Sequence, residues 1–221
     1  MTPRARMMMI NEKTQQQSAN DGTMPQMMID LNNVPVPDRI MTRLTEWNKI
    51  RGKQMITNGA QPEWTSPIAP FLLQQMKQPR QFKGNPIQEQ EYQYQLSEEL
   101  KNGIIKETNS IQVFKPTFIV SRKDGRLRKI LESRKINFFT KHVHFKMDGP
   151  EQLRQILHQS DYATILDIKD AFHHIHVQQN LQQFLSFKFK NRSYTYTGPL
   201  FGWNLSPFFF SKTLAIAIRA F

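Results

Sequence analysis

The chain has 221 residues, a formal net charge of +12 and no cysteine. With 38% hydrophobic residues, it is long enough for one well-packed domain and an extension, but short of two full domains. The absence of cysteine excludes disulfides, thiolate metal sites and thiol nucleophiles. The positive charge favours a polyanionic partner. Because no apolar stretch approaches the roughly 20 residues that span a bilayer, we expect nucleic acid rather than a membrane.

Residues 1–61 are rich in Met, Gln, Asn and Thr, and Trp47 is their only aromatic residue. Such a composition buries too little apolar surface to offset chain entropy, so we predict a mostly disordered leader. A short helix over residues 37–51 is the alternative. The apolar run at residues 7–10 is too short for a signal peptide, which indicates an intracellular protein that is not secreted.

Residues 62–86 form a Pro-rich lead-in with five prolines, which favours an extended segment over long regular elements. A helix is predicted over residues 87–102. Leu96 and Leu100 are four residues apart there, and Gly103 offers a C-terminal stop.

A hairpin is predicted next, with strands at residues 117–121 and 127–131 joined by a Lys-Asp-Gly turn. The surrounding residues 115–146 contain ten Lys and Arg against two acidic residues. Basic and apolar residues alternate, as in a sheet with one packed face and one face toward phosphates. A plain solvated face is the alternative interpretation.

Beyond the hairpin, Pro150 predicts a helix through about Leu157, because proline suits the first helical turn. An apolar strand is predicted at residues 162–167. A second hairpin is expected from the alternating aromatic and polar residues at 184–190 and 193–197. Finally, Ser206 and Pro207 predict the N-cap and first turn of a helix that runs to the end of the chain.

The predicted strand at 162–167 ends in a carboxylate, Asp167, and Asp170 follows three residues later. A carboxylate at the mouth of a buried strand is costly unless a cation or hydrogen bonds hold it. The pattern therefore raises the hypothesis of a metal site, with a turn-capping Asp as the alternative.

Three segments in order resemble reverse transcriptases. Residues 118–137 are similar to the fingers hairpin, LDIKDAF at 166–172 resembles motif A, and the run from Tyr196 to Lys212 resembles motif B. The resemblance covers roughly residues 86–221. It points to retrotransposon enzymes, with the tyrosine-recombinase group as a candidate subgroup.

This resemblance implies an α+β fold, with right-hand polymerase fingers and a partial palm at residues 87–221. It also implies RNA-directed DNA polymerase activity by two-metal nucleotidyl transfer, on an RNA or DNA template-primer with deoxynucleoside triphosphates. Family members carry a further Asp-Asp pair beyond motif B, and the chain ends at Phe221 before it. We therefore expect a fragment truncated inside the palm, inactive by itself.

By the same resemblance, Asp167 would be the catalytic carboxylate that binds two Mg²⁺ or Mn²⁺ ions, with the carbonyl of Ile168 as a further ligand. Asp170 and Ala171 would offer backbone amides to the triphosphate. Phe172 would lie beneath the sugar and exclude ribonucleotides, so the product would be DNA.

The other implied contacts lie in the fingers and in motif B. Lys123 and Arg128 would grip the triphosphate, and Gly202 would let the backbone approach the templating base pair. The residues implied to hold the template strand and the hairpin base are Glu132, Arg134 and Asn137.

Two further hypotheses remain open. One is a degenerate, inactive remnant that still binds nucleic acid, and the other is a basic scaffold unrelated to polymerisation. A zinc site at His173, His174 and His176 is disfavoured, because no second pair of ligands follows at the usual spacing.

Overall fold

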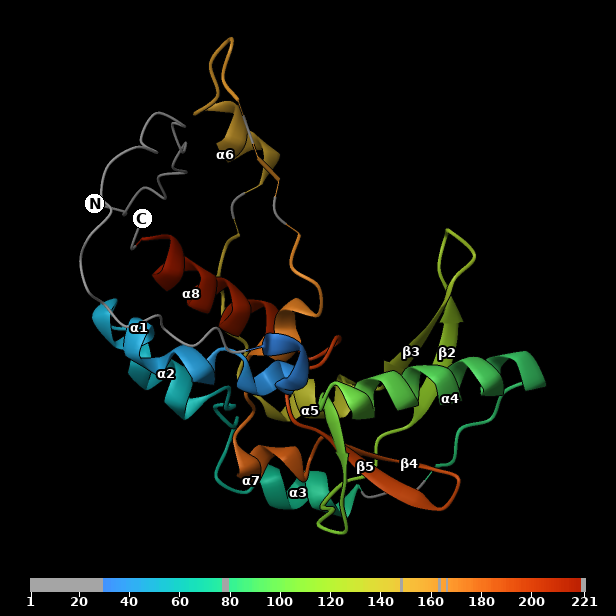
Figure 1. Cartoon of the computed structure of the whole chain (residues 1–221). Helices are drawn as coiled ribbons and strands as arrows, with labels where there is room; N and C mark the ends of the chain where they lie inside the picture. Colours follow the sequence, from blue (N-terminus) through green and yellow to red (C-terminus); the bar gives the residue numbers. More distant parts are fainter. Residues whose placement is uncertain (1–29, 77–79, 148, 163, 166, 220–221) are drawn as a thin grey trace.

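A computed structural model describes residues 30–76, 80–147, 149–162, 164–165 and 167–219. Two small antiparallel sheets lie near the centre and on one side of the molecule, with helices around them (Figure 1). One continuous apolar core joins helix α4, both sheets and the loop before helix α8.

The described part of the predicted leader is helical rather than disordered. Its elements are η1 (Leu31–Asn33), η2 (Val36–Asp38), η3 (Met41–Arg43), α1 (Leu44–Lys49) and α2 (Lys53–Asn58). Val36, Ile56 and Ala60 are buried, and η2 packs against η4 of the central region. These residues are too few to form a core of their own, and they are buried because they pack on the rest of the domain. Residues 1–29 of the predicted leader lie outside the described residues.

Helix α4 (Pro86–Lys101) confirms the predicted helix within one residue at each end. Asn85 caps it by accepting a hydrogen bond from the Gln88 amide at 2.9 Å, while the Gln88 side chain accepts from the Asn85 amide at 3.0 Å. This capping box and the proline at the first helical position fix where the helix begins.

The first hairpin is also confirmed, with β2 (Thr117–Ser121) paired to β3 (Leu127–Leu131) over all five residues. Gly125 in its turn has a φ of +80°, which glycine adopts without strain. The hairpin projects above α4 and away from the body of the molecule (Figure 1).

The second hairpin forms within the predicted range. Strand β4 (Ser186–Phe189) pairs with β5 (Arg192–Tyr196), and β1 (Ile105–Glu107) pairs with the other edge of β5. Lys190 and Asn191 both have positive φ, as a tight turn between twisted strands requires.

The remaining helices connect these units: α3 (Ala69–Gln75) within the Pro-rich lead-in, α5 (Arg134–Phe139), η4 (Ala171–His174), α7 (Gln179–Gln182) and α8 (Ser206–Ile218). Helix α8 was predicted, but its N-cap is Leu205. The Ser206 hydroxyl lies inside the first turn and donates to the Leu200 carbonyl at 2.7 Å. Among the helices described, none combines the length and apolar character that a membrane crossing requires.

The predicted strand at 162–167 is not formed by the described residues of that segment. Ile165 is 93% exposed there. A strand satisfies its backbone N–H and C=O groups by pairing with a neighbouring strand. No strand of the described chain pairs with this segment. The preceding helix α6 (Pro150–Arg154) is shorter than predicted and stands out from the body of the molecule (Figure 1).

Candidate functional site

Three side chains from distant parts of the sequence meet between the β2–β3 hairpin and helix α8. The guanidinium carbon of Arg128 on β3 lies 4.0 Å from the ring centre of Phe201, in the loop before α8. The ring of Phe172 on η4 lies 4.9 Å from the same ring and 5.8 Å from Phe210 on α8. We call Arg128, Phe172 and Phe201 the Arg–Phe stack. Its cation–π contact holds the guanidinium in place before any ligand binds.

Gly202 directly follows the stack and is tied to α5. Its carbonyl accepts a hydrogen bond from the Asn137 side-chain amide at 2.7 Å, and the Asn137 oxygen accepts from the Asn204 backbone amide at 3.0 Å. Gly202 has a φ of +97°, which a residue with a Cβ adopts only with strain. Asn137, which was predicted to hold the template, and Gly202 are therefore neighbours, and Asn137 fixes the loop that contains the glycine.

Asp170 and Ala171 mark the beginning of η4. Asp170 adopts a left-handed conformation, with φ of 55° and ψ of 32°, and its carbonyl accepts from the His173 amide at 2.8 Å. This turn aims Phe172 at Phe201. Asp170 and Ala171, which were predicted to bind the triphosphate, therefore directly precede Phe172 of the Arg–Phe stack and belong to the same turn.

His173, which was not among the residues predicted to bind nucleotide, packs beside the Arg–Phe stack. Its ring stacks on Tyr196 at 6.0 Å and meets Phe201 edge-on at 6.1 Å. Its Nδ1 finds no hydrogen-bond partner in the described chain, and burial lowers the pKa of the imidazole to about 4. A Cβ on Gly198 would lie 3.0 Å from the His173 backbone, so motifs A and B approach each other closely here.

Glu132 and Arg134 form an ion pair at the base of the hairpin. The Glu132 carboxylate accepts hydrogen bonds from the Arg134 amide at 2.8 Å and from the guanidinium at 2.8 and 3.0 Å. These bonds lower the pKa of Glu132. The Arg134 side chain is 88% exposed, so its charge remains available to solvent and to a ligand.

The remaining predicted site residues, Lys123, Asp167 and Ile168, have no contact with the Arg–Phe stack among those that the structure describes. Lys123 lies in the exposed turn of the hairpin, and Asp167 and Ile168 lie in an exposed segment without regular structure. Among the described residues, no three acidic or His side chains gather closely enough to hold a metal ion. A single exposed carboxylate does not fit a two-metal site, which needs several oxygen ligands.

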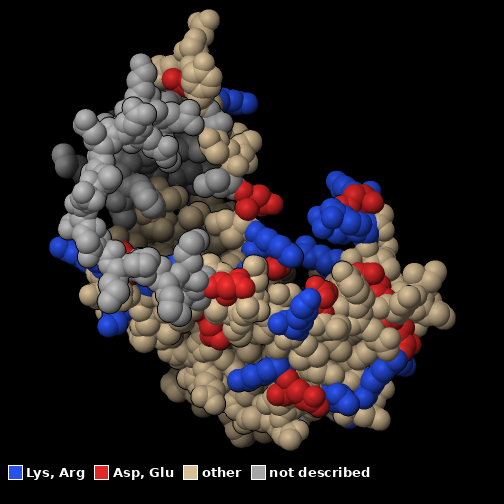
Figure 2. Space-filling model, in the orientation of Figure 1, with Lys and Arg blue, Asp and Glu red and all other residues tan. Residues whose placement is uncertain are grey.

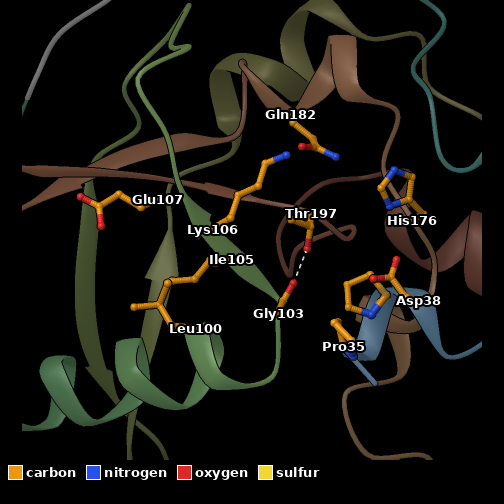
Figure 3. Close-up of a pocket in the computed structure, with 11 residues that line it drawn as sticks. Pro35, Asp38, Leu100, Gly103, Ile105, Lys106, Glu107, His176, Gln182 and Thr197 are labelled. Atoms are coloured by element: carbon orange, nitrogen blue, oxygen red, sulfur yellow. Dashed lines mark hydrogen bonds between the residues drawn. The ribbon is translucent and has the colours of Figure 1, made fainter. Parts of the chain in front are cut away.

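The surface beside the β2–β3 hairpin is hollowed. Figure 2 shows a notch between the hairpin and the rest of the molecule, with Lys and Arg gathered at the hairpin tip and along the floor, together with fewer Asp and Glu. Clustered positive charge of this kind attracts phosphate-bearing ligands.

Comparison with known proteins gives a consistent result. The family model described as reverse transcriptase (RNA-dependent DNA polymerase) matches residues 115–221. The Transposon Tf2-7 and Tf2-8 polyproteins of Schizosaccharomyces pombe are each 28% identical over 113 residues. That match covers 51% of this chain but 8% of each polyprotein, so the chain spans a small part of these relatives.

Solved structures with the same fold include the foamy viral protease-reverse transcriptase in complex with dsDNA, with a TM-score of 0.58 and 18% identity. This match covers 74% of the chain and 32% of the viral protein. The same enzyme in complex with RNA/DNA hybrid also has a TM-score of 0.58 and 18% identity, over 66% of this chain and 19% of that one. The α+β arrangement described above is therefore that of polymerase fingers and part of a palm.

The family match covers the Arg–Phe stack, Gly202 and Asn137, which are the residues that the fold brings together. Residues 115–221 match the reverse transcriptase family, and the similarity to retrotransposon polyproteins and to viral reverse transcriptase structures supports part of a retroelement polymerase domain.

Proposed function

We propose that residues 87–221 bind the incoming nucleotide and template-primer in an RNA-directed DNA polymerase that copies a retrotransposon. The Arg–Phe stack carries this proposal, because it brings a fixed guanidinium, aromatic rings and a glycine loop together at one point. Guanidinium groups bind phosphate through paired hydrogen bonds, and the ring of Phe172 supplies a steric limit for a sugar.

Template-primer is the second expected partner. The viral neighbours were solved with dsDNA and with RNA/DNA hybrid. In this chain, the exposed guanidinium of Arg134 and the Asn137–Gly202 contact lie at the base of the hairpin, where a template strand would pass. Lys123 at the exposed turn would reach the phosphates of a bound nucleotide or strand.

Reverse transcriptases use divalent metal ions, and we propose Mg²⁺ or Mn²⁺ for this one. Asp167 and the carbonyl of Ile168 would be the contribution of this chain to the metal site. The described residues do not complete that site, so we expect further carboxylates from elsewhere in the polymerase.

The proposal is tested by nucleotide binding to the chain, measured by displacement of a fluorescent deoxynucleoside triphosphate. Arg128→Ala should weaken binding by about tenfold, because one charge-assisted contact is worth about 1.5–3 kcal/mol. Arg126→Ala is the matched control, since Arg126 is exposed on the same hairpin and pairs with Asp124. Equal losses in both variants, or none in either, would count against the stack as the nucleotide site.

Phe172→Ala should admit ribonucleotides. Removal of the ring opens space beneath the sugar, so in a polymerase that includes the rest of the domain we expect the preference for dNTP over rNTP to fall by about 10-fold or more. Phe208→Ala is the control, because Phe208 packs against Phe145 and Phe209 away from the stack. Steady-state incorporation of both sugars measures the ratio, and an unchanged ratio for Phe172→Ala would remove its steric role.

A further inference from the structure

Arg128 lies on a strand that helix α4 holds from the other side. Side chains alternate along a strand, so Arg128 faces Phe201 while its neighbour Lys129 points to the opposite face. Lys129 has no exposed side-chain surface and forms an ion pair with Glu99 of α4. The direction of Lys129 thus determines the direction of Arg128.

A second residue of α4 holds the backbone on both sides of Arg128. The Gln95 side-chain amide donates to the Leu127 carbonyl at 2.9 Å, and its oxygen accepts from the Lys129 amide at 2.9 Å. One glutamine thus binds the edge of β3 as a neighbouring strand would. Gln95 and Glu99 are four residues apart and share one face of α4.

Aromatic rings complete the surroundings of the Lys129 ammonium. It lies 4.6 Å from the ring centre of Phe187 and 5.4 Å from those of Tyr92 and Tyr196. The Tyr196 hydroxyl also donates to Glu99 at 3.3 Å. These contacts join α4 and strands β4 and β5 to a single cation on β3, and ion pairs buried in this way have directional geometry that apolar contacts lack.

We propose that Gln95 and Glu99 are positioning residues, which fix strand β3 so that Arg128 is held over Phe201. That Arg128 receives a triphosphate rests on the proposed function, but the placement of Arg128 by α4 does not. The contacts of Gln95 with the backbone at 127 and 129 bracket the residue they would position.

The test measures the distance across the candidate site without any ligand. The chain has no cysteine, so spin labels attach only at introduced cysteines. Ser121→Cys places one label at the exposed end of β2, and Lys212→Cys places the other at an exposed position of α8. Pulsed electron resonance then gives the distribution of distances between the hairpin and α8. Labelled chain with native Gln95 and Glu99 should give one narrow distribution.

Two variants remove the contacts while the fold is retained. Gln95→Leu loses both hydrogen bonds to β3. The double variant Glu99→Leu with Lys129→Met replaces the ion pair by apolar side chains, which proteins often tolerate. Both should broaden the distance distribution, and Lys101→Met on the exposed end of α4 should not. The proposal is overturned if both variants fold and both keep the narrow distribution. That result would show that Gln95 and Glu99 stabilise the fold without positioning β3.

The affinity of the unlabelled chains for dATP separates this inference from the proposed function. We expect each variant to bind about fivefold more weakly, as the loss of about 1 kcal/mol of positioning predicts. If the chain with native Gln95 and Glu99 does not bind dATP, the proposed function fails, and the distance measurement still decides whether α4 positions β3.

Discussion

Asp167→Asn should abolish DNA synthesis in a polymerase that includes this chain and the remainder of the domain, with a loss of about three orders of magnitude or more. Asparagine keeps the size of the side chain and removes its charge, and hard divalent cations need charged oxygen ligands in such sites. Binding of template-primer should change little, because Asp167→Asn leaves the exposed Arg134 guanidinium and the Asn137 contact with Gly202 in place, and Asp167 takes part in neither.

The matched control is Asp161→Asn. Asp161 lies six residues earlier in the same segment, where its carboxylate accepts a hydrogen bond from the His158 amide at 2.7 Å. Primer extension on an RNA template with Mg²⁺ measures both variants, and gel-shift titration measures template binding. Residual synthesis within about tenfold of the unsubstituted enzyme for Asp167→Asn would exclude the metal role, because loss of a metal carboxylate costs far more than that.

The contrast between Asp167 and the Arg–Phe stack shows which parts of the site the sequence could predict. Arg128, Phe172 and Gly202 were all identified from motif resemblance, and the fold brings them together. The predicted strand before Asp167 needs a partner strand that local sequence does not specify, and the described residues provide none. A pattern of apolar residues shows that a segment can be buried, but not what buries it.

The two hairpins and α4 were predictable for a simpler reason. Their signals are local: a glycine turn, alternating residues and a capping box lie within each element. Residues 1–61 were predicted to be mostly disordered because their composition buries little apolar surface, yet a few of residues 30–61 are buried against distant parts of the chain. Composition measures what a segment can bury by itself and does not include what its neighbours provide.

The buried cations were not predicted at all, since Lys115 and Lys129 read in the sequence as part of a solvated or phosphate-facing charge run. Both are in fact buried, at 1% and 7% exposure. Lys129 has Glu99 and three aromatic rings around it, whereas the Lys115 ammonium finds no hydrogen-bond partner among the residues that the structure describes. The same substitution at these two positions should therefore have opposite effects on stability.

Lys115→Met should stabilise the chain at pH 7, by about 3 kcal/mol. Burial lowers the pKa of Lys115 to about 7, only partly offset by the charge of Glu132, so the folded state either holds an unpaired ammonium or gives up its proton. Methionine has nearly the same length and carries no such cost. The free energy of unfolding, from urea titration monitored by circular dichroism, measures the difference.

The stability difference between Lys115→Met and the native chain should depend on pH, which a difference in packing alone would not cause. Between the folded pKa near 7 and the unfolded pKa of 10.5, the unfolded chain binds more protons at Lys115 than the folded chain does, so raising the pH stabilises the lysine form. The advantage of Lys115→Met should therefore shrink by about half between pH 7 and pH 9. A constant advantage over that range would show that better packing, and not removal of a buried charge, is its cause.

Lys129→Met is the matched control, and it should destabilise the chain by about 3 kcal/mol. It leaves the Glu99 carboxylate without its cation, at a position where burial already raises the pKa of that group. Adding Glu99→Leu should recover most of the loss, because the unpaired buried carboxylate is then removed as well. Equal destabilisation by Lys115→Met and Lys129→Met would contradict the prediction. It would show that pairing with Glu99 does not change what a buried lysine contributes to stability.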